Sequence, residues 1–362
     1  MMERIVKIGI IGCGGIANGK HMPSLSALPN VKLVAFCDII PERAQKAKEK
    51  YGTPDAKVYT DYKELLKDES IEVVHVLTPN REHAPITIDA LYAGKHVMCE
   101  KPMAKTAADA RRMVAAAKAT GKKLTVGYQH RHKAESDYAK QYIESGEMGE
   151  IYHADCLAIR RRGTPNWGVF LDAEAQGGGP IIDIATHSLD LTLYLMNNYE
   201  PAVVLGKTHK KLEHPEAGNI WGDNGVSTTP LEEAADAMIV MKNGATVMLE
   251  TSWAINTDEP VQEGSCVLCG SKAGLSLKNN VLKLNKILLG RAVDTTVDTS
   301  AGGVAFYSGS KGSPAQVEAK RWIDAIINDT DPVVLPEQAC VVSEILEAIY
   351  TSSKTGKPVI FE

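Results

Sequence analysis

Along the first 127 residues, short apolar runs alternate with longer segments in which apolar residues recur every three or four positions. The runs have the length of buried strands, and the longer segments, such as 41–52 and 107–121, have the spacing of amphipathic helices. Strands and helices in alternation predict right-handed crossovers and a parallel sheet. The strands are expected at 6–11, 32–37, 73–77, 96–99 and 124–126.

The pattern changes near residue 128. We expect a helix over 134–145, a strand over 151–160 and, after a glycine-rich loop, a helix over 180–197. The chain then alternates apolar and polar residues, which is typical of antiparallel strands with one face in the core. Asn243-Gly244 lies between two of these runs and predicts a two-residue hairpin turn. The expected strands are 235–241, 246–253, 265–269 and 281–285.

Two polar segments and two final helices complete the pattern. Residues 210–231 and 290–313 are rich in Gly, Ser and Thr and predict long loops, which are often functional or lie at assembly contacts. Helices are expected near 314–328 and 336–353, and we expect them to pack back against the first domain.

The chain has 362 residues, which is too long for one ordinary core and indicates two domains. We predict an α/β fold in which residues 1–127 form one domain on a parallel sheet. Residues 128–362 would form a second α/β domain on a mostly antiparallel sheet.

Composition restricts the class of protein. A net charge of −5 argues against nucleic acid or an anionic membrane as the main partner. No apolar stretch approaches the roughly 20 residues that cross a bilayer, and charged residues interrupt the start, so no signal peptide is expected. The seven cysteines are an odd number in mostly apolar segments, which is typical of a reducing compartment. We therefore expect a cytoplasmic protein.

Metal binding is not expected. Cys266 and Cys269 form a CxxC pair, but neither a second pair nor a pair of histidines completes a zinc set. Asp183 and His187 lack an obvious third ligand.

The segment VKIGIIGCGGIA, at 6–17, is an apolar run that breaks into glycines. Glycines there allow a tight turn and a close backbone approach to phosphate, while the following helix offers free N–H groups and the positive end of its dipole. The pattern predicts a dinucleotide site that includes Gly12, Gly14, Gly15 and Ile16.

Asp38 stands at the end of the next expected strand. A carboxylate at this position accepts hydrogen bonds from the adenosine ribose hydroxyls and repels a 2′-phosphate. The next residues are Ile39 and Ile40, so no arginine is at hand to bind such a phosphate. Asp38 therefore favours NAD over NADP.

Lys101 lies in MCEKP, at 98–102, where a later strand of the same sheet should end. A lysine there can hold a substrate hydroxyl, or take its proton if burial lowers its pKa. A buried structural cation paired with Glu100 is the alternative.

The helix that begins in GGGPIID carries a second set of candidates. Asp183, His187 and Tyr194 share one face at helical spacing, and Pro180 suits the helix start. An acid and an imidazole on one stripe can orient a sugar hydroxyl and accept its proton. The three glycines would let a ligand approach the backbone. The alternative is a structural Asp–His pair at a domain interface. The opposite, core face would consist of Ile182, Leu189, Leu193 and Met196.

The segment IRRRGTPNWGVF, at 159–170, ends a strand with three arginines and Trp167. Trp167 is a candidate for stacking on a sugar ring or on the nicotinamide. Arginines on an edge strand with a packed tryptophan are the alternative. The arginines hint at an acidic or phosphorylated sugar, or else pair with Asp172 or Glu174.

These motifs in this order resemble the family of glucose–fructose oxidoreductase and inositol dehydrogenase, over essentially the full chain. EKP at 100–102 followed by DxxxH at 183–187 is the most specific mark, beside TPN at 78–80 and GYQHR at 127–131. The resemblance implies that residues 1–127 form a dinucleotide-binding Rossmann domain. It also implies that residues 128–362 form an open-sheet α/β domain that binds substrate and forms the contact of a dimer or tetramer.

The resemblance also implies roles for individual residues. Lys101, Asp183 and His187 would face the substrate. Lys101 and His187 are both candidates for the base, and the near-neutral pKa of an unperturbed imidazole favours His187. Arg160, Arg162 and Trp167 would border the active site and bind substrate. The residues that would line the cofactor are Thr78, Asn80, His83, Glu100, Lys101 and Gln129.

The function expected is NAD-dependent oxidation of a secondary hydroxyl of a sugar, sugar derivative or inositol, by a homodimer or homotetramer. One alternative is a redox-neutral epimerase, lyase or glycosidase that uses tightly bound NAD through a transient keto-sugar. Another is a sugar sensor that binds NAD without catalysis. The loops 160–176 and 210–231 would select the substrate.

Overall fold

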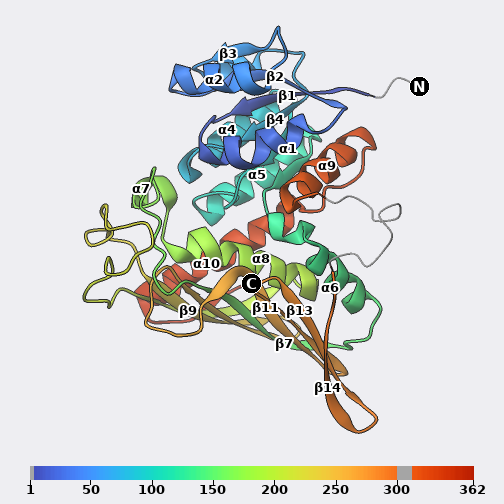
Figure 1. Cartoon of the computed structure of the whole chain (residues 1–362), viewed down its shortest axis with the longest axis vertical. Coiled ribbons are helices and arrows are strands. Elements are labelled where there is room, and N and C mark those ends of the chain that lie inside the picture. Colours follow the sequence, from blue (N-terminus) through green and yellow to red (C-terminus); the bar gives the residue numbers. More distant parts are fainter. Residues whose placement is uncertain (1–3, 300–311) are drawn as a thin grey trace. The chain divides into compact units, whose positions relative to one another are not determined.

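The computed structural model describes residues 4–299 and 312–362 (Figure 1). This part of the chain forms two units, each with its own sheet. The first unit runs to Gln129 and includes a return segment that ends at Cys340, and the second comprises the chain from His130 together with Val341–Glu362.

The first unit contains a six-stranded sheet in the order β3-β2-β1-β4-β5-β6, in which every neighbouring pair is parallel. The strands are β1 (Val6–Ile11), β2 (Val31–Cys37), β3 (Lys57–Tyr59), β4 (Val73–Val76), β5 (His96–Cys99) and β6 (Leu124–Val126). The five expected strands are confirmed to within a residue. Strand β3 was not predicted, because three residues are too few to show a pattern.

Helices connect these strands, and their ends follow from local chemistry. Thr106 caps the first turn of α5 (Ala107–Thr120) by accepting a hydrogen bond from the Asp109 N–H, and Gly121 ends the helix in a left-handed conformation. The other helices of this unit are η1 (Ala17–His21), α1 (Met22–Ser26), α2 (Pro41–Tyr51), α3 (Tyr62–Leu66), α4 (Asn80–Tyr92) and α9 (Pro314–Ile327). Trp322 and Ile323 of α9 belong to the same core cluster as Ile8 and Ile10 of β1.

The second unit contains a nine-stranded sheet in the order β14-β13-β12-β11-β7-β10-β9-β8-β15. Only the β7–β10 pair is parallel among these described strands, which confirms the mostly antiparallel prediction. The strands are β7 (Ile151–Ile159), β8 (Pro201–His209), β9 (Ala234–Met241), β10 (Thr246–Ser252), β11 (Val261–Gly270), β12 (Ala273–Lys278), β13 (Val281–Leu288), β14 (Arg291–Thr296) and β15 (Val359–Ile360).

Helix α8 (Thr186–Met196) packs on β7 and β11, and α6 (Ala134–Glu144) packs on β12 and β13 (Figure 1). Helix α10 (Pro336–Thr355) begins in the first unit and reaches β8, where the Ser352 hydroxyl accepts a hydrogen bond from the Gly206 N–H. The remaining helices are η2 (Gln129–His132), α7 (Ala173–Gln176) and η3 (Ile181–Ala185).

Two local predictions for the second unit were wrong. Residues 290–313 were expected to form a loop, but β14 pairs with β13 over Arg291–Thr296, and residues 300–311 lie outside the described part. The β9–β10 turn is longer than two residues, because Gly244 has a φ of +89° while Asn243 is not left-handed. The Gly244 N–H donates to the Met241 carbonyl, as in a three-residue hairpin loop.

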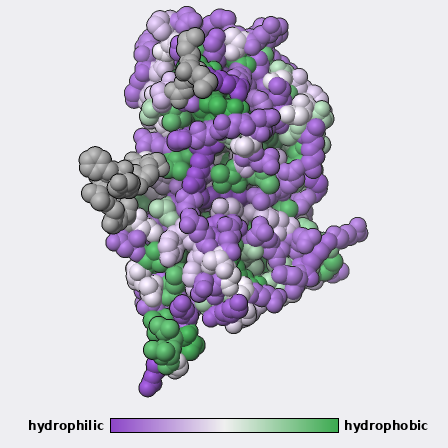
Figure 2. Space-filling view, turned by 90° about the vertical axis from the view of Figure 1, so that its right-hand side faces the viewer, coloured by the Kyte–Doolittle hydropathy of each residue, from purple (hydrophilic) through white to green (hydrophobic). Residues whose placement is uncertain are grey.

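The turn of the β13–β14 hairpin is apolar and exposed. Ile287 is largely exposed, Leu288 is about half exposed, and Leu289 is 96% exposed. Figure 2 shows this apolar surface at the lower end of the view.

The helix expected over 180–197 is two elements. A π-helical segment, η3, leads into α8, and a π turn contains more residues than an α turn, which shifts the faces. Helix α8 is buried almost all round, and its buried residues include the polar His187 and Asp190. Arg131 makes a bidentate ion pair with Asp190, at 2.9 Å from Nε and 2.6 Å from Nη2.

We predict that Asp190→Ala lowers the free energy of unfolding by about 3–5 kcal/mol, because Arg131 would remain buried without its counter-charge. Both side chains of the pair are 0% exposed. Asp324→Ala removes one partner of the exposed Lys320–Asp324 pair and should cost less than about 1 kcal/mol. Urea unfolding of the two variants measures both values, and equal losses would contradict the account.

Candidate functional site

The glycine turn after β1 has one glycine required by the backbone and two that leave space. Gly12 has a φ of +93°, and a Cβ added to it would lie 2.6 Å from the Leu77 carbonyl oxygen. A Cβ on Gly14 or Gly15 would meet no atom within 4 Å. Ile16 is partly exposed at the start of η1. The turn therefore has the open backbone surface that a pyrophosphate needs.

Asp38 is held at the end of β2 by two backbone groups. Its Oδ2 accepts the Cys13 N–H at 2.8 Å and its Oδ1 accepts the Ile40 N–H at 2.9 Å. These bonds fix the carboxylate beside the glycine turn and leave lone pairs on both oxygens. The geometry fits an acceptor for ribose hydroxyls.

Thr78 follows β4 at the same carboxyl edge of the sheet. Its Oγ1 is buried and has no hydrogen-bond partner among the described residues. Buried hydroxyls are normally paired, so this atom fits a site that a ligand completes. Asn80 begins α4, and Gln129 begins η2.

His83 acts on the backbone at this edge. Its Nδ1 lies 2.8 Å from the Pro102 carbonyl oxygen and its Nε2 lies 2.9 Å from the Thr78 carbonyl oxygen. Burial lowers the pKa of His83, so the neutral ring is favoured. The ring thus joins the segments after β4 and β5, and the cofactor contact that the resemblance implied for His83 stays a prediction.

Glu100 is the centre of a buried charge network. Its Oε1 lies 2.8 Å from Lys20 Nζ and 2.7 Å from His21 Nε2, and its Oε2 accepts the Lys101 N–H at 2.9 Å. Lys20 also pairs with Glu318 of α9 at 2.9 Å. Glu100 therefore holds the backbone of Lys101 and is connected through Lys20 to the return segment that contains α9.

The network keeps both central groups charged. Burial alone would raise the pKa of Glu100, but Lys20 and His21 hold it well below its usual range. Burial alone would lower the pKa of Lys20, but Glu100 and Glu318 raise it. The sequence analysis missed Lys20, His21 and Glu318. Charged residues in a helical turn that must pack on the sheet were the available signal for the first two.

In the second unit, Asp183 of η3 is fixed by two side chains. Its Oδ2 accepts the Trp253 indole N–H at 2.9 Å and lies 3.6 Å from Arg160 Nη1. Arg160 also reaches Glu263 at 3.5 Å. Neither Trp253 nor Glu263 was singled out from the sequence, because both lie far from Asp183 along the chain.

His187 is buried at the start of α8, four residues after Asp183. Its ring meets that of His130 edge-to-face, with centroids 4.9 Å apart. His130 packs against Gly264, where any Cβ would overlap its ring. The imidazole of His187 therefore has a fixed aromatic neighbour.

Of the three glycines before η3, two contact other parts of the protein and so do not leave their backbone open to a ligand. A Cβ on Gly178 would overlap the Tyr350 hydroxyl, and the Gly179 N–H donates to Glu232 Oε1 at 2.9 Å. The Tyr350 hydroxyl donates to the same oxygen at 2.6 Å, and burial raises the pKa of Glu232. Gly178 and Gly179 thus admit a buried carboxyl that anchors the helix start, which corrects the expected role.

The arginines after β7 separate into two roles. Strand β7 lies inside the sheet, so the edge-strand alternative is wrong. Arg162 donates to the carbonyls of Ala217 and Ile255 and therefore ties loops together, while Arg160 points to Asp183. Neither arginine makes a described contact with Asp172, which caps α7.

Trp167 is 48% exposed and contacts Trp221, a residue that the sequence analysis did not select. Trp221 belongs to the loop expected over 210–231, and the structure confirms that this segment has neither helix nor strand.

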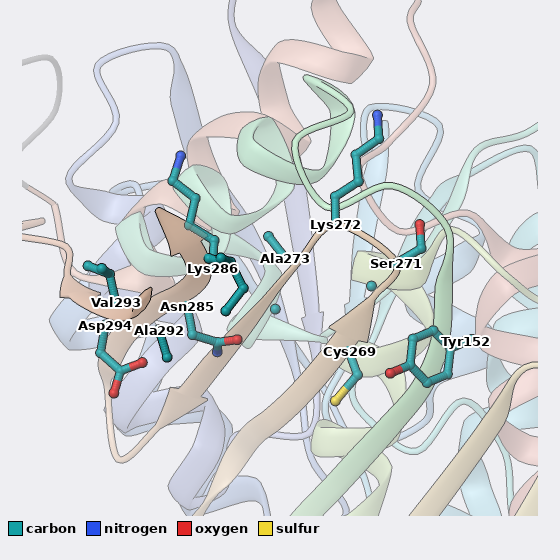
Figure 3. Close-up of a pocket in the computed structure, with 13 residues that line it drawn as sticks. Tyr152, Cys269, Ser271, Lys272, Ala273, Asn285, Lys286, Ala292, Val293 and Asp294 are labelled. Atoms are coloured by element: carbon teal, nitrogen blue, oxygen red, sulfur yellow. The ribbon is translucent and has the colours of Figure 1, made fainter. Parts of the chain in front are cut away.

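A separate hollow of about 300 Å³ lies on the second sheet, around the β11–β12 turn and β13 (Figure 3). Tyr152 and Cys269 lie side by side there from the adjacent strands β7 and β11. None of its lining residues is a candidate site residue from the sequence.

Residues 4–299 and 312–362 also bear on metal binding and membrane insertion. No group of three His, Cys, Asp or Glu side chains is arranged to hold a metal ion in this part. Cys266 and Cys269 lie three residues apart on β11, so their side chains point to opposite faces of the sheet. Within the same residues, no helix is long and apolar enough to span a bilayer.

A parallel sheet whose carboxyl edge carries an open glycine turn and a fixed acid defines a dinucleotide-binding protein. The chain belongs to the GFO/IDH/MocA oxidoreductase family. Residues 6–128 match the model described as "Oxidoreductase family, NAD-binding Rossmann fold", and residues 137–276 match the "GFO/IDH/MocA C-terminal domain". The resemblance, the fold class and the NAD cofactor expected from the sequence are confirmed.

Known relatives include dehydrogenases. The chain is 32% identical to D-glucoside 3-dehydrogenase of Escherichia coli K12 over 99% of this chain and 98% of that protein. It is 39% identical to inositol 2-dehydrogenase of Salmonella typhimurium over 53% of this chain and 55% of that protein.

Solved structures share the fold. Levoglucosan dehydrogenase in complex with NADH and levoglucosan has a TM-score of 0.83 at 22% identity, over 99% of each chain. Aldose–aldose oxidoreductase from Caulobacter crescentus, complexed with glycerol, has a TM-score of 0.80 at 24% identity, over 99% of this chain and 100% of that one.

We predict that Gly14→Ala and Gly12→Ala fail in different ways. Gly14→Ala has room for its methyl group, so its unfolding should stay within about 0.5 kcal/mol of the parent, while its dissociation constant for NAD rises at least about tenfold. Gly12→Ala should lose about 1–3 kcal/mol of stability without any cofactor, because of its φ and its contact with Leu77. Unfolding curves and NAD titrations measure the two effects. Unchanged NAD affinity in Gly14→Ala would remove the turn from the cofactor site.

We predict that Asp38→Asn weakens NAD binding and lowers the ratio of the affinity for NAD to the affinity for NADP. The variant keeps the shape of the side chain but loses the charge that repels a 2′-phosphate. Glu42→Gln removes an exposed charge from the first turn of α2 and is the matched control. Titration with both cofactors gives the two ratios. A ratio in Asp38→Asn equal to that of the control would refute the ribose assignment.

Proposed function

We propose that this protein is an NAD-dependent dehydrogenase that oxidises a secondary hydroxyl of a sugar, a sugar derivative or an inositol. The observation that carries the proposal is the cluster of Asp183, Arg160 and Trp253 beside the His187 helix, within a family whose full-length relative is a glucoside dehydrogenase. The cluster offers a carboxylate oxygen and guanidinium N–H groups, which are the donors and acceptors that ring hydroxyls need.

NAD⁺, when bound, supplies the acceptor for the hydride that leaves the carbinol carbon. The residues proposed to hold it are Gly12, Gly14 and Gly15 at the phosphates, Asp38 at the ribose and Thr78 through its unpaired hydroxyl. The side chains of the protein then bind the sugar, orient one hydroxyl and remove its proton.

We assign roles in this step to three residues. Lys101 holds the reacting hydroxyl and His187 takes its proton, because an imidazole has an unperturbed pKa near neutrality. Asp183, fixed by Trp253 and Arg160, orients the substrate. The buried pairing of Glu100 supports Lys101 by holding its backbone N–H. The cytoplasmic location and the homo-oligomer expected from the sequence stay predictions.

We predict that NADH accumulates when the protein is mixed with NAD⁺ and a panel of hexoses, methyl glucosides, uronic acids and inositols. Lys101→Met and His187→Ala should each lower kcat by roughly 100- to 10,000-fold, which is the usual contribution of a general acid or base, while NAD binding is retained. Lys118→Met removes an exposed lysine that pairs with Glu337 and is the control.

Absorbance at 340 nm measures turnover, and calorimetry measures NAD binding. Full activity in either site variant would exclude that residue from proton transfer. If no substrate of the panel yields NADH although NAD binds, net oxidation is contradicted, and the redox-neutral enzyme or the sensor is favoured.

A further inference from the structure

We propose that Trp167 and Trp221 form a subsite for the group that follows the oxidised ring, so that the substrate is a glycoside rather than a free monosaccharide. This inference rests on the proposed function and names its substrate class. The aglycone of such a glycoside would be a second sugar ring or an aromatic group, which stacks on the exposed indole.

The two indoles are exposed and in contact. Trp167 is 48% exposed and Trp221 is 40% exposed, whereas Trp253 and Trp322 are buried. The rings of Trp167 and Trp221 meet edge-to-face, with centroids 4.8 Å apart and planes at 83°. Phe170 adds a third ring, 5.4 Å from Trp167. Two indoles held partly in solvent are a surface that an apolar partner would cover.

Hydrogen bonds join the two loops that carry Trp167 and Trp221. The Asn166 side chain donates to the carbonyls of Trp221 and Gly222, both at 2.8 Å. Asn219 accepts the Thr164 N–H at 2.9 Å and donates to the Thr164 carbonyl at 3.1 Å. These bonds position both indoles before any ligand binds, which reduces the entropy lost on binding.

Arg160 connects this pair to the proposed substrate site. Its guanidinium lies 5.7 Å from the centre of the Trp221 ring, and its Nη1 lies 3.6 Å from Asp183 Oδ2. A single guanidinium therefore separates the indole from the carboxylate that orients the oxidised ring. A group attached to that ring can reach Trp221 while the ring contacts Asp183.

The chemistry favours a glycoside. A pyranose presents a face of C–H groups that packs on an aromatic ring, and its hydroxyls lie at the edge, where Arg160 offers N–H donors. A free monosaccharide bound at Asp183 would leave the indoles uncovered. The subsite therefore predicts discrimination by what is attached to the ring.

The test compares phenyl β-D-glucoside with D-glucose as substrates of the full-length protein. Trp221→Leu keeps apolar volume but removes the ring, and should lower the ratio of kcat/KM for the glucoside to that for glucose by about tenfold. Trp221→Phe should restore most of the ratio. Ile220→Ala changes the exposed neighbour in the same loop and should leave the ratio as in the parent.

Calorimetric binding of phenyl β-D-glucoside in the presence of NADH gives a second reading that does not need turnover. Weaker binding in Trp221→Leu than in Ile220→Ala supports the subsite even if no sugar is oxidised, in which case the proposed function fails alone. Equal ratios and equal affinities in these two variants would overturn the subsite, and would leave the exposed indoles as a surface for another protein.

Discussion

The first unit depends on one buried carboxylate. Glu100 lies at the carboxyl end of β5 and is paired with Lys20 and His21, from the helical turn that follows the glycine loop. A buried charge is tolerated only when it is paired and hydrogen-bonded. The pairing therefore fixes the glycine-loop helix, the end of β5 and the backbone of Lys101 in one arrangement.

The same network ties in the return of the chain. Glu318 of α9 completes the pairing of Lys20, and Trp322 and Ile323 place α9 in the core of the parallel sheet. A helix from near the end of the sequence thus supports the cofactor edge. The backbone of Lys101, to which the proposed function gives a catalytic role, is thus linked through Glu100 and Lys20 to Glu318, which lies more than two hundred positions further along the chain.

Much of the fold follows from the sequence, because periodicity reports which faces are buried. The parallel strands and the glycine turn were predictable, and so was Asp38 at a strand end. The π turn before α8 was not, since the spacing of apolar residues at 180–197 is that of an ordinary helix, and Gly179, before the turn, binds Glu232, which is distant along the chain. Strands β3, β8, β14 and β15 were not predicted; β3 and β15 are very short, and β14 is mostly exposed.

The sequence indicates candidate site residues but not the contacts that hold them. Lys101, Asp183 and His187 stand out by motif. Their partners come from distant segments that no local pattern connects, as with Trp253 for Asp183. His83 was a candidate for binding the cofactor and Arg162 for binding substrate, and in the structure the side chains of both contact backbone carbonyls.

The central claim is that this protein transfers a hydride from a ring carbon to NAD⁺. The most direct test is a single turnover with a methyl glucoside deuterated at one carbon at a time, with the NADH examined by mass spectrometry. The account predicts that one position alone slows NADH formation and delivers its deuterium to the cofactor. Unlabelled NADH from every position, or no NADH from a bound glucoside, would contradict it.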